Sequence, residues 1–128
     1  MNNKPGAIEL LAITRQAFVE EILSALPEER RYTALMIANA MAIARREIDA
    51  GDEPAKRELR SLCELLGVTE PQAHAREPDA ALAALNRELI DNLRAGRYDR
   101  DHARLLKHLR EVTEAKLAIS NPKMLGGK

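Results

Sequence analysis

The sequence predicts an all-α protein, a single-domain antiparallel bundle of four long helices and one shorter helix. First, residues 32 to 48 read YTALMIANAMAIARREI, and from Ala34 to Ala44 the only polar residue is Asn39. A helix that is apolar on every side must be surrounded by other protein, so this segment is expected at the centre of the bundle. Second, apolar residues elsewhere recur at steps of three and four. Third, no segment shows the alternation of a strand bounded by turns.

The first two helices are bounded by proline and glycine. The first is expected over residues 5–26, because proline suits a first helical turn and Pro27 ends the helix. The second is expected from Glu28, whose charge suits the helix N-terminus, to Gly51, which suits the position after a helix end. The stripe of the first helix has one polar member, Arg15, and consists of Ile8, Leu11, Arg15, Phe18 and Ile22, closed by Leu26.

Three further helices have their own start and stop signals. The third is expected over residues 52–66, with Asp52 as N-cap and Gly67 as its stop. The fourth is expected over residues 78–95, and the fifth from Asp99 or Asp101 to Ser120, because Asn121-Pro122 disfavours helical geometry. Their apolar faces are expected to be Leu59, Leu62, Cys63 and Leu66; Leu82, Leu85, Asn86, Leu89, Ile90 and Leu93; and Leu105, Leu106, Leu109, Val112, Thr113, Lys116 and Leu117. The bundle domain is thus predicted over residues 5–122, with a disordered tail over 123–128.

The segment between the third and fourth helices, Thr69 to Glu77, is predicted to be a connection with one helical turn. Thr69 and Gln72 have the spacing of a capping box. The stretch LCELLGVTEPQAHARE resembles a helix-turn-helix, but Pro78 cuts the supposed recognition helix short and its glutamates disfavour contact with phosphate. Specific DNA binding is therefore disfavoured.

Composition excludes several classes of partner. The 128 residues suit one domain, and 20 Lys and Arg balance 20 Asp and Glu, so no net field attracts nucleic acid or an anionic membrane. The aromatic residues, Phe18, Tyr32 and Tyr98, are too few for the stacking that single-stranded nucleic acid requires. The single cysteine, Cys63, is expected to be a buried apolar residue.

Targeting signals are also missing from the sequence. Glu9 interrupts the apolar stretch near the start before a signal-peptide core forms. The uncharged run around Asn39 is shorter than the roughly 20 residues that cross a bilayer. We therefore expect a cytoplasmic protein with no membrane contact.

No segment has the spacing of a known catalytic or metal site. His102 and His108 are six residues apart, which puts them on different helix faces. Asp99 and His102 are three apart, but an N-cap explains the aspartate better than a metal does. The serines Ser24, Ser61 and Ser120 have no partner histidine in the sequence. We expect no metal, no cofactor and no catalytic residue, and the balance is against an enzyme.

Four polar residues lie on otherwise apolar stripes: Arg15, Asn39, Asn86 and Lys116. One interpretation is structural: the asparagines form hydrogen bonds between helices, while the Arg15 and Lys116 stems cover apolar surface. The other is functional: the two cations and two amides converge on an anionic ligand.

The sequence also resembles a known family. The segments KPGAIELLAITRQAFVEEIL, MIANAMAIARREIDAG, LAALNRELIDNLRAGRYD and HLREVTEAKLAISNP are similar to a bacterial family of small helical proteins described as a domain of unknown function. The similarity spans Pro5 to Pro122, and its most specific pieces are Ala38-Asn39-Ala40, Lys116-Leu117 and Asn121-Pro122. It implies an all-α fold and assigns no catalytic residue. Members are often encoded near acyl-CoA dehydrogenase-like and aminoglycoside-phosphotransferase-like proteins, which implies an association with acyl-CoA or phosphate-bearing metabolites.

Two hypotheses for function follow. The first is an accessory module that binds a protein partner, including a second copy of itself, because the central helix is apolar all round and catalytic constellations are missing. The second is a binder of, or weak enzyme on, a small anionic metabolite such as an acyl-CoA or a phosphate ester, at Arg15, Asn39, Asn86 and Lys116.

Overall fold

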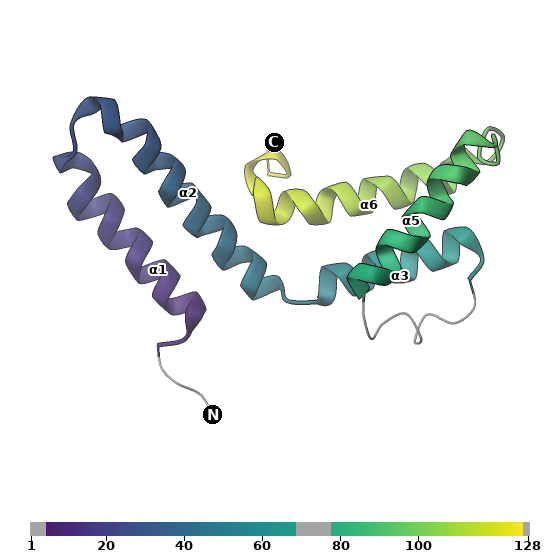
Figure 1. Ribbon diagram of the computed structural model, residues 1–128, viewed down its shortest axis with the longest axis horizontal. Helices are drawn as coiled ribbons and strands as arrows, with labels where there is room; N and C mark the ends of the chain where they lie inside the picture. Colours follow the sequence, from purple (N-terminus) through teal and green to yellow (C-terminus); the bar gives the residue numbers. More distant parts are fainter. Residues whose placement is uncertain (1–4, 69–77, 127–128) are drawn as a thin grey trace. The chain divides into compact units, whose positions relative to one another are not determined.

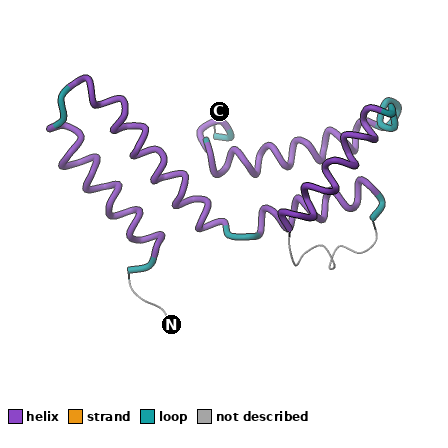
Figure 2. The backbone as a smooth tube through the Cα atoms, viewed as in Figure 1, coloured by secondary structure: helices purple, strands orange, loops and turns teal. Residues whose placement is uncertain are grey.

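A computed structural model describes residues 5–68 and 78–126, and these residues form five α-helices and no strand (Figures 1 and 2). The prediction of an all-α fold is confirmed. The predicted connection Thr69 to Glu77 lies outside the described residues. The helices are α1 (Ala7–Ala17), α2 (Glu28–Ala50), α3 (Glu53–Leu66), α5 (Pro78–Arg94) and α6 (His102–Ser120).

The chain groups into two compact units. The first contains residues 1–51 with residues 119–121, and the second contains residues 52–118 with residues 122–128. The single bundle domain over residues 5–122 stays a prediction. Past α6, Pro122–Met124 forms one 3-10 turn within the segment for which disorder was predicted. No helix among the described residues is long and apolar enough to cross a membrane.

In the first unit, α1 and α2 form an antiparallel hairpin (Figure 1). After α1 the chain continues through a π-helical segment, Phe18–Ile22, and a 3-10 turn, Leu23–Ala25. The residue before Pro27 leaves the helix, since Leu26 is extended with ψ 150°. The helix predicted over residues 5–26 is therefore present, but its last turns are first wider and then tighter than an α-helix.

The predicted burial of residues 34–44 within this chain is wrong. Only Ala34 and Ala38 are fully buried on α2, at 3% and 2% exposure. These small side chains let α1 approach closely on one face of α2. Leu35 and Met36 are exposed on the rest of the helix, and so is Asn39, which was predicted to be a buried amide. The helix is apolar all round as the sequence says, but α1 covers only one of its sides.

The second unit has a core shared by three helices. Leu59, Leu62 and Cys63 of α3 pack with residues of α5 and α6, as their periodicity predicts. The buried members from the other two helices are Leu85, Leu89 and Leu105. Gly67 ends α3 in the left-handed conformation, with φ 74° and ψ 25°. Asp52 is the N-cap of α3, as predicted, although its side chain makes no capping hydrogen bond.

The predicted apolar face of α6 is also partly wrong. Leu106 and Leu109 are exposed, whereas Leu105 and His108 are buried. The helix is therefore turned so that a histidine faces α3. The imidazole tolerates this burial because Ser61 of α3 provides a hydrogen-bond partner. On α5, Ile90 and Leu93 are likewise exposed rather than part of the core.

Candidate functional site

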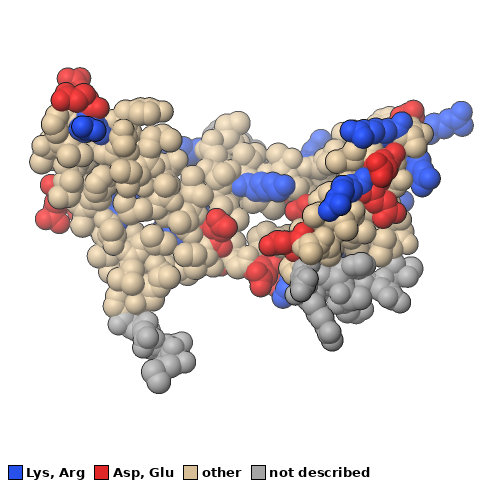
Figure 3. All heavy atoms as spheres, viewed as in Figure 1, with Lys and Arg blue, Asp and Glu red and all other residues tan. Residues whose placement is uncertain are grey.

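The side of α2 that faces away from α1 carries a row of large side chains. Tyr32, Met36, Asn39 and Ile43 are spaced by four, three and four residues, and we call them the outer stripe. At about 100° per residue, they lie roughly 100–160° around the helix from Ala38. Tyr32 is 74% exposed and Met36 is 53% exposed, while Ile43 is half-buried. Over the hairpin the visible surface is mostly uncharged (Figure 3).

This spacing is that of a helix–helix seam. Positions that alternate steps of three and four align along one side of a helix and fit between the side chains of a facing helix. The seam has an amide at its middle, Asn39, and otherwise presents apolar or aromatic atoms. An arrangement of this kind can bind another helix, and its one ionisable side chain, Tyr32, has no other ionisable residue of the stripe to act with.

Arg15 fastens the two helices of the hairpin together. Its Nε donates a hydrogen bond of 3.0 Å to the carbonyl oxygen of Ala38. This bond explains a cation on the apolar stripe of α1, because it supplies a polar partner within the contact between the helices. It also holds the face of Ala38 toward α1, and the outer stripe therefore points away from α1.

A groove of about 560 Å³ lies between α1 and α2. Three arginines, Arg15, Arg45 and Arg46, line it together with the apolar Leu11 and Met41. Positive charge beside apolar atoms suits an amphipathic anion. The groove thus includes one residue of the predicted anion pocket, and its other cations were not foreseen.

The four predicted ligand residues come from four helices and from both units. Arg15 on α1 and Asn39 on α2 belong to the first unit, and Asn86 on α5 and Lys116 on α6 belong to the second. Arg15 bonds to the residue next to Asn39, so these two are close in the hairpin. Asn86 is half-buried and Lys116 is exposed. The convergence of all four on one ligand stays a prediction.

Ser61 has a histidine partner in space, although none lies near it in the sequence. Ser61 Oγ lies 2.6 Å from Nδ1 of His108, 47 residues later in the chain. His108 is 4% exposed, and this burial lowers the pKa of its imidazole, while the charges of Glu58 and Glu111 act to raise it. A signal for the pair was present in the sequence, because α3 and α6 carry the same pattern of residue types around Ser61 and His108.

Metal and thiol chemistry have little support in the described part of the chain. No group of three His, Cys, Asp or Glu side chains there could hold a metal ion. Cys63 is buried as expected, and burial raises the pKa of its thiol, which disfavours the reactive thiolate.

Comparison with known proteins gives one result. A family model described as a domain of unknown function, DUF6285, matches residues 24–124, which is most of the chain. No curated protein and no solved structure matches this chain. The match covers α2, α3, α5 and α6, and therefore includes both the outer stripe and the Ser61–His108 pair. The chain belongs to the DUF6285 family, a domain of unknown function.

Proposed function

We propose that this protein is a helical accessory module that binds a second copy of itself through the outer stripe of α2. The observation that carries the proposal is the exposure of Tyr32 and Met36 in the outer stripe, and of the neighbouring Leu35, on a helix that fully buries only two alanines. Side chains of this size that expose half their area or more offer on the order of 100 Å² each to a partner. Burial of such a patch is the main favourable term in helix association.

Within the first unit, the described residues give the hairpin no second layer of helices. Helices in globular proteins take most of their stability from packing one apolar side against other elements, and a lone pair of helices has little to pack. Two hairpins that join by their α2 helices form a four-helix arrangement, a common solution for antiparallel helices with short connections. Because the formal net charge of the chain is zero, two copies do not repel each other through their overall charge.

The apolar surface around Asn39 includes one pair of positions that match across a two-fold axis, Leu35 and Ile43. In a two-fold dimer with antiparallel α2 helices centred on Asn39, each position meets the one equally far on the other side. Leu35 then meets Ile43 of the second copy. The Asn39 amide meets its own copy, and because it holds both a donor and an acceptor, the two amides satisfy each other. An amide at such a position fixes register and the number of chains.

Light scattering coupled to size exclusion tests the proposal. The wild-type chain is expected to elute with twice the mass of one chain at micromolar concentration. Met36→Glu is expected to give monomers, because it buries a charge in the seam. Ile37→Glu is the matched control, since Ile37 is similarly exposed but lies on another side of α2, and it is expected to leave the dimer intact. A wild-type monomer, or equal dissociation of both variants, would refute the proposal. Far-UV circular dichroism confirms that each variant remains helical.

The groove beside Arg15 favours a second candidate function, which is binding of a small anionic metabolite such as an acyl-CoA. Its three arginines and apolar residues suit a ligand with a charged end and an apolar chain. The resemblance to a bacterial family encoded near acyl-CoA dehydrogenase-like proteins adds an association, and this role implies a cytoplasmic location. Acyl-CoA esters are expected to raise the melting temperature of the wild type but not of Arg15→Ala. The absence of a shift in the wild type argues against this candidate.

A further inference from the structure

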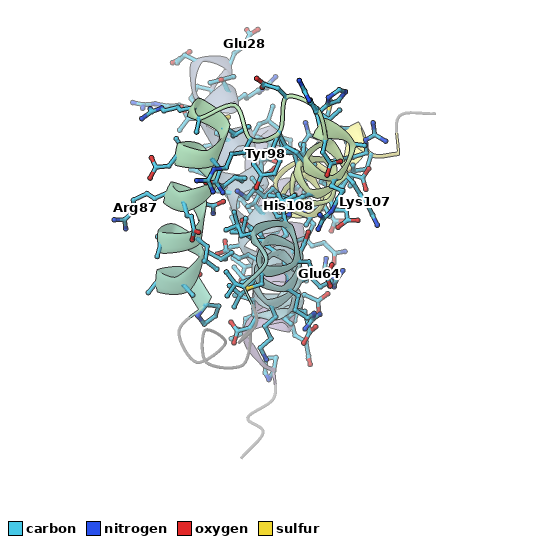
Figure 4. The ribbon with its side chains drawn as sticks, turned by 90° about the vertical axis from the view of Figure 1, so that its right-hand side faces the viewer. Glu28, Glu64, Arg87, Tyr98, Lys107 and His108 are labelled. Carbon is cyan, nitrogen blue, oxygen red and sulfur yellow. The ribbon has the colours of Figure 1, made fainter. Side chains whose placement is uncertain are left out.

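A second cleft, of about 360 Å³, lies between α3 and α6 within the second unit. Each helix contributes two cations, one hydroxyl or imidazole, and one glutamate. From α3 these are Arg57, Arg60, Ser61 and Glu64. From α6 they are Arg104, Lys107, His108 and Glu111. Glu64, Lys107 and His108 are labelled in Figure 4.

The two sets have the same order and spacing along the chain. In each, a cation is followed after three residues by a second cation, then directly by Ser61 or His108, and after three more residues by glutamate. Positions at i, i+3, i+4 and i+7 lie on one side of a helix. Each helix thus presents a complete polar face, and these faces line the same cleft. The cleft is a feature of the pair of helices, since each helix supplies only one of its two polar walls.

Two contacts establish that the helices run antiparallel here. Ser61 pairs with His108, and Nη2 of Arg104 donates a hydrogen bond of 3.0 Å to the carbonyl oxygen of Glu64. Each step toward the C-terminus of α3 is therefore matched by a step toward the N-terminus of α6. By the same alignment, Arg57 is opposite Glu111. At both ends of the cleft an arginine of one helix is thus opposite a glutamate of the other.

Charge therefore cancels at the ends of the cleft and remains at its middle. Arg60 and Lys107 precede Ser61 and His108 directly, one on each helix, so both cations flank the paired side chains. Two positive charges on opposite walls suit a dianion, and the guanidinium fork with an ammonium group is a common combination for phosphate. Phosphate monoesters carry close to two charges at neutral pH.

The Ser61–His108 pair has one hydrogen-bond donor to spare. A neutral imidazole carries one N–H and serine one O–H, and their mutual bond uses only one of these. If the serine donates to Nδ1, the imidazole keeps its N–H at Nε2; if Nδ1 donates, the serine keeps its O–H. In either tautomer the pair can donate one bond to an acceptor, and burial lowers the pKa of the His108 imidazole, which favours the neutral ring.

We propose that the cleft between α3 and α6 binds the phosphate group of a small phosphate monoester, with Arg60 and Lys107 as its counter-charges and the Ser61–His108 pair as a further donor. The volume accommodates a phosphate with a small organic group. Glu64 and Glu111 at the two ends can accept hydrogen bonds from hydroxyl or amine groups, and they leave the ends without the excess positive charge that further phosphates need. The ligand class is therefore a small hydroxylated or aminated monoester rather than a polyphosphate.

Titration of the full-length chain with glycerol 2-phosphate tests this site, followed by the ring resonances of His108 in NMR and by calorimetry. Millimolar or tighter binding is expected, together with a saturable shift of His108 that His102 does not share. Arg60→Gln and Lys107→Gln are each expected to weaken binding at least about tenfold. Arg87→Gln removes the same charge from an exposed position on α5 and is expected to leave binding unchanged.

Three outcomes would overturn the proposal: no saturation by about 10 mM ligand, a His108 signal that does not move, or equal weakening by Arg87→Gln. Triphosphate is included as a second probe, because tighter binding of triphosphate than of the monoester contradicts the role given to the glutamates. Each variant is compared with the wild type by circular dichroism, and Ser61→Ala, which removes only the hydroxyl, is used under conditions in which its spectrum matches that of the wild type. It is expected to weaken binding less than the loss of either cation does.

Discussion

The Ser61–His108 hydrogen bond is expected to contribute measurably to the free energy of unfolding, and a double-mutant cycle measures that contribution. Ser61→Ala leaves Nδ1 of an imidazole that is only 4% exposed without its partner at 2.6 Å. The cost of an unpaired buried polar group is about 1–3 kcal/mol. His108→Leu leaves the half-buried Ser61 hydroxyl unpaired, although the leucine regains apolar burial. In the double variant neither polar group remains, and the loss is therefore expected to be smaller than the sum of the single losses.

We expect a coupling energy of about 1 kcal/mol, at the lower side of the range for contacting pairs because water reaches the half-buried Ser61. Urea unfolding at about pH 8 is the assay, since both groups are then neutral. All variants are compared at one protein concentration, because association shifts apparent stability. Ser61→Ala combined with His102→Leu is the control pair, since His102 is exposed. A coupling below about 0.3 kcal/mol, or equal to that of the control pair, would refute the reasoning.

Three further predictions concern pH, the core and the seam. Burial lowers the pKa of His108 in the folded chain below its ordinary value of 6.5, so the unfolded chain binds the proton more readily. The contribution of His108 to stability is therefore fully present above about pH 6.5 and is lost as the pH falls toward the folded pKa. Urea unfolding is expected to detect this pH dependence, and His108→Leu is expected to reduce it. Leu62, at 0% exposure, is at the centre of the three-helix core. Leu62→Ala is expected to lower the free energy of unfolding, measured by chemical denaturation, by about 2–5 kcal/mol. A loss below about 1 kcal/mol would contradict this packing. Asn39→Leu is expected to retain association but to broaden the distribution of oligomers in light scattering, and a uniform dimer of unchanged affinity would show that the amide does not set the register.

Helix boundaries could be predicted well from the sequence because local chemistry sets them. Helix α2 begins directly after Pro27 and ends directly before Gly51, as expected, and Gly67 ends α3. In each case the cause is a single residue whose backbone cannot continue a helix or readily leaves it. Such effects need no knowledge of the rest of the fold.

The side that each helix buries was harder to predict. On α6, Leu105, Leu106 and Leu109 fit two different faces, and the choice between them depends on His108, whose partner is 47 residues away. Periodicity treats this histidine as polar and therefore places it outside, whereas Ser61 satisfies it inside. The repeated pattern on α3 and α6 can be read from the sequence, but the structure was needed to show that the two faces lie against each other.

The candidate site shows the same limit. The apolar character of residues 34–44 was evident from the sequence, but not which atoms cover them. A single chain provides α1 for one side of α2, where Arg15 bonds to the backbone of Ala38. The sequence pattern is the same whether the other sides meet the same chain or another one.

The π-helical segment Phe18–Ile22 has a consequence for how this protein tolerates changes in length. Its widened turn is closed by a bond from the amide of Leu23 to the carbonyl oxygen of Phe18, five residues back, and thus holds one residue more than an α-helical turn. Deletion of one residue here leaves a regular helix whose downstream side chains keep their direction. The same deletion within α2 turns every later side chain by about 100° and separates Tyr32 from Ile43. Natural variation in length is therefore expected to concentrate in the first helix and to spare the second.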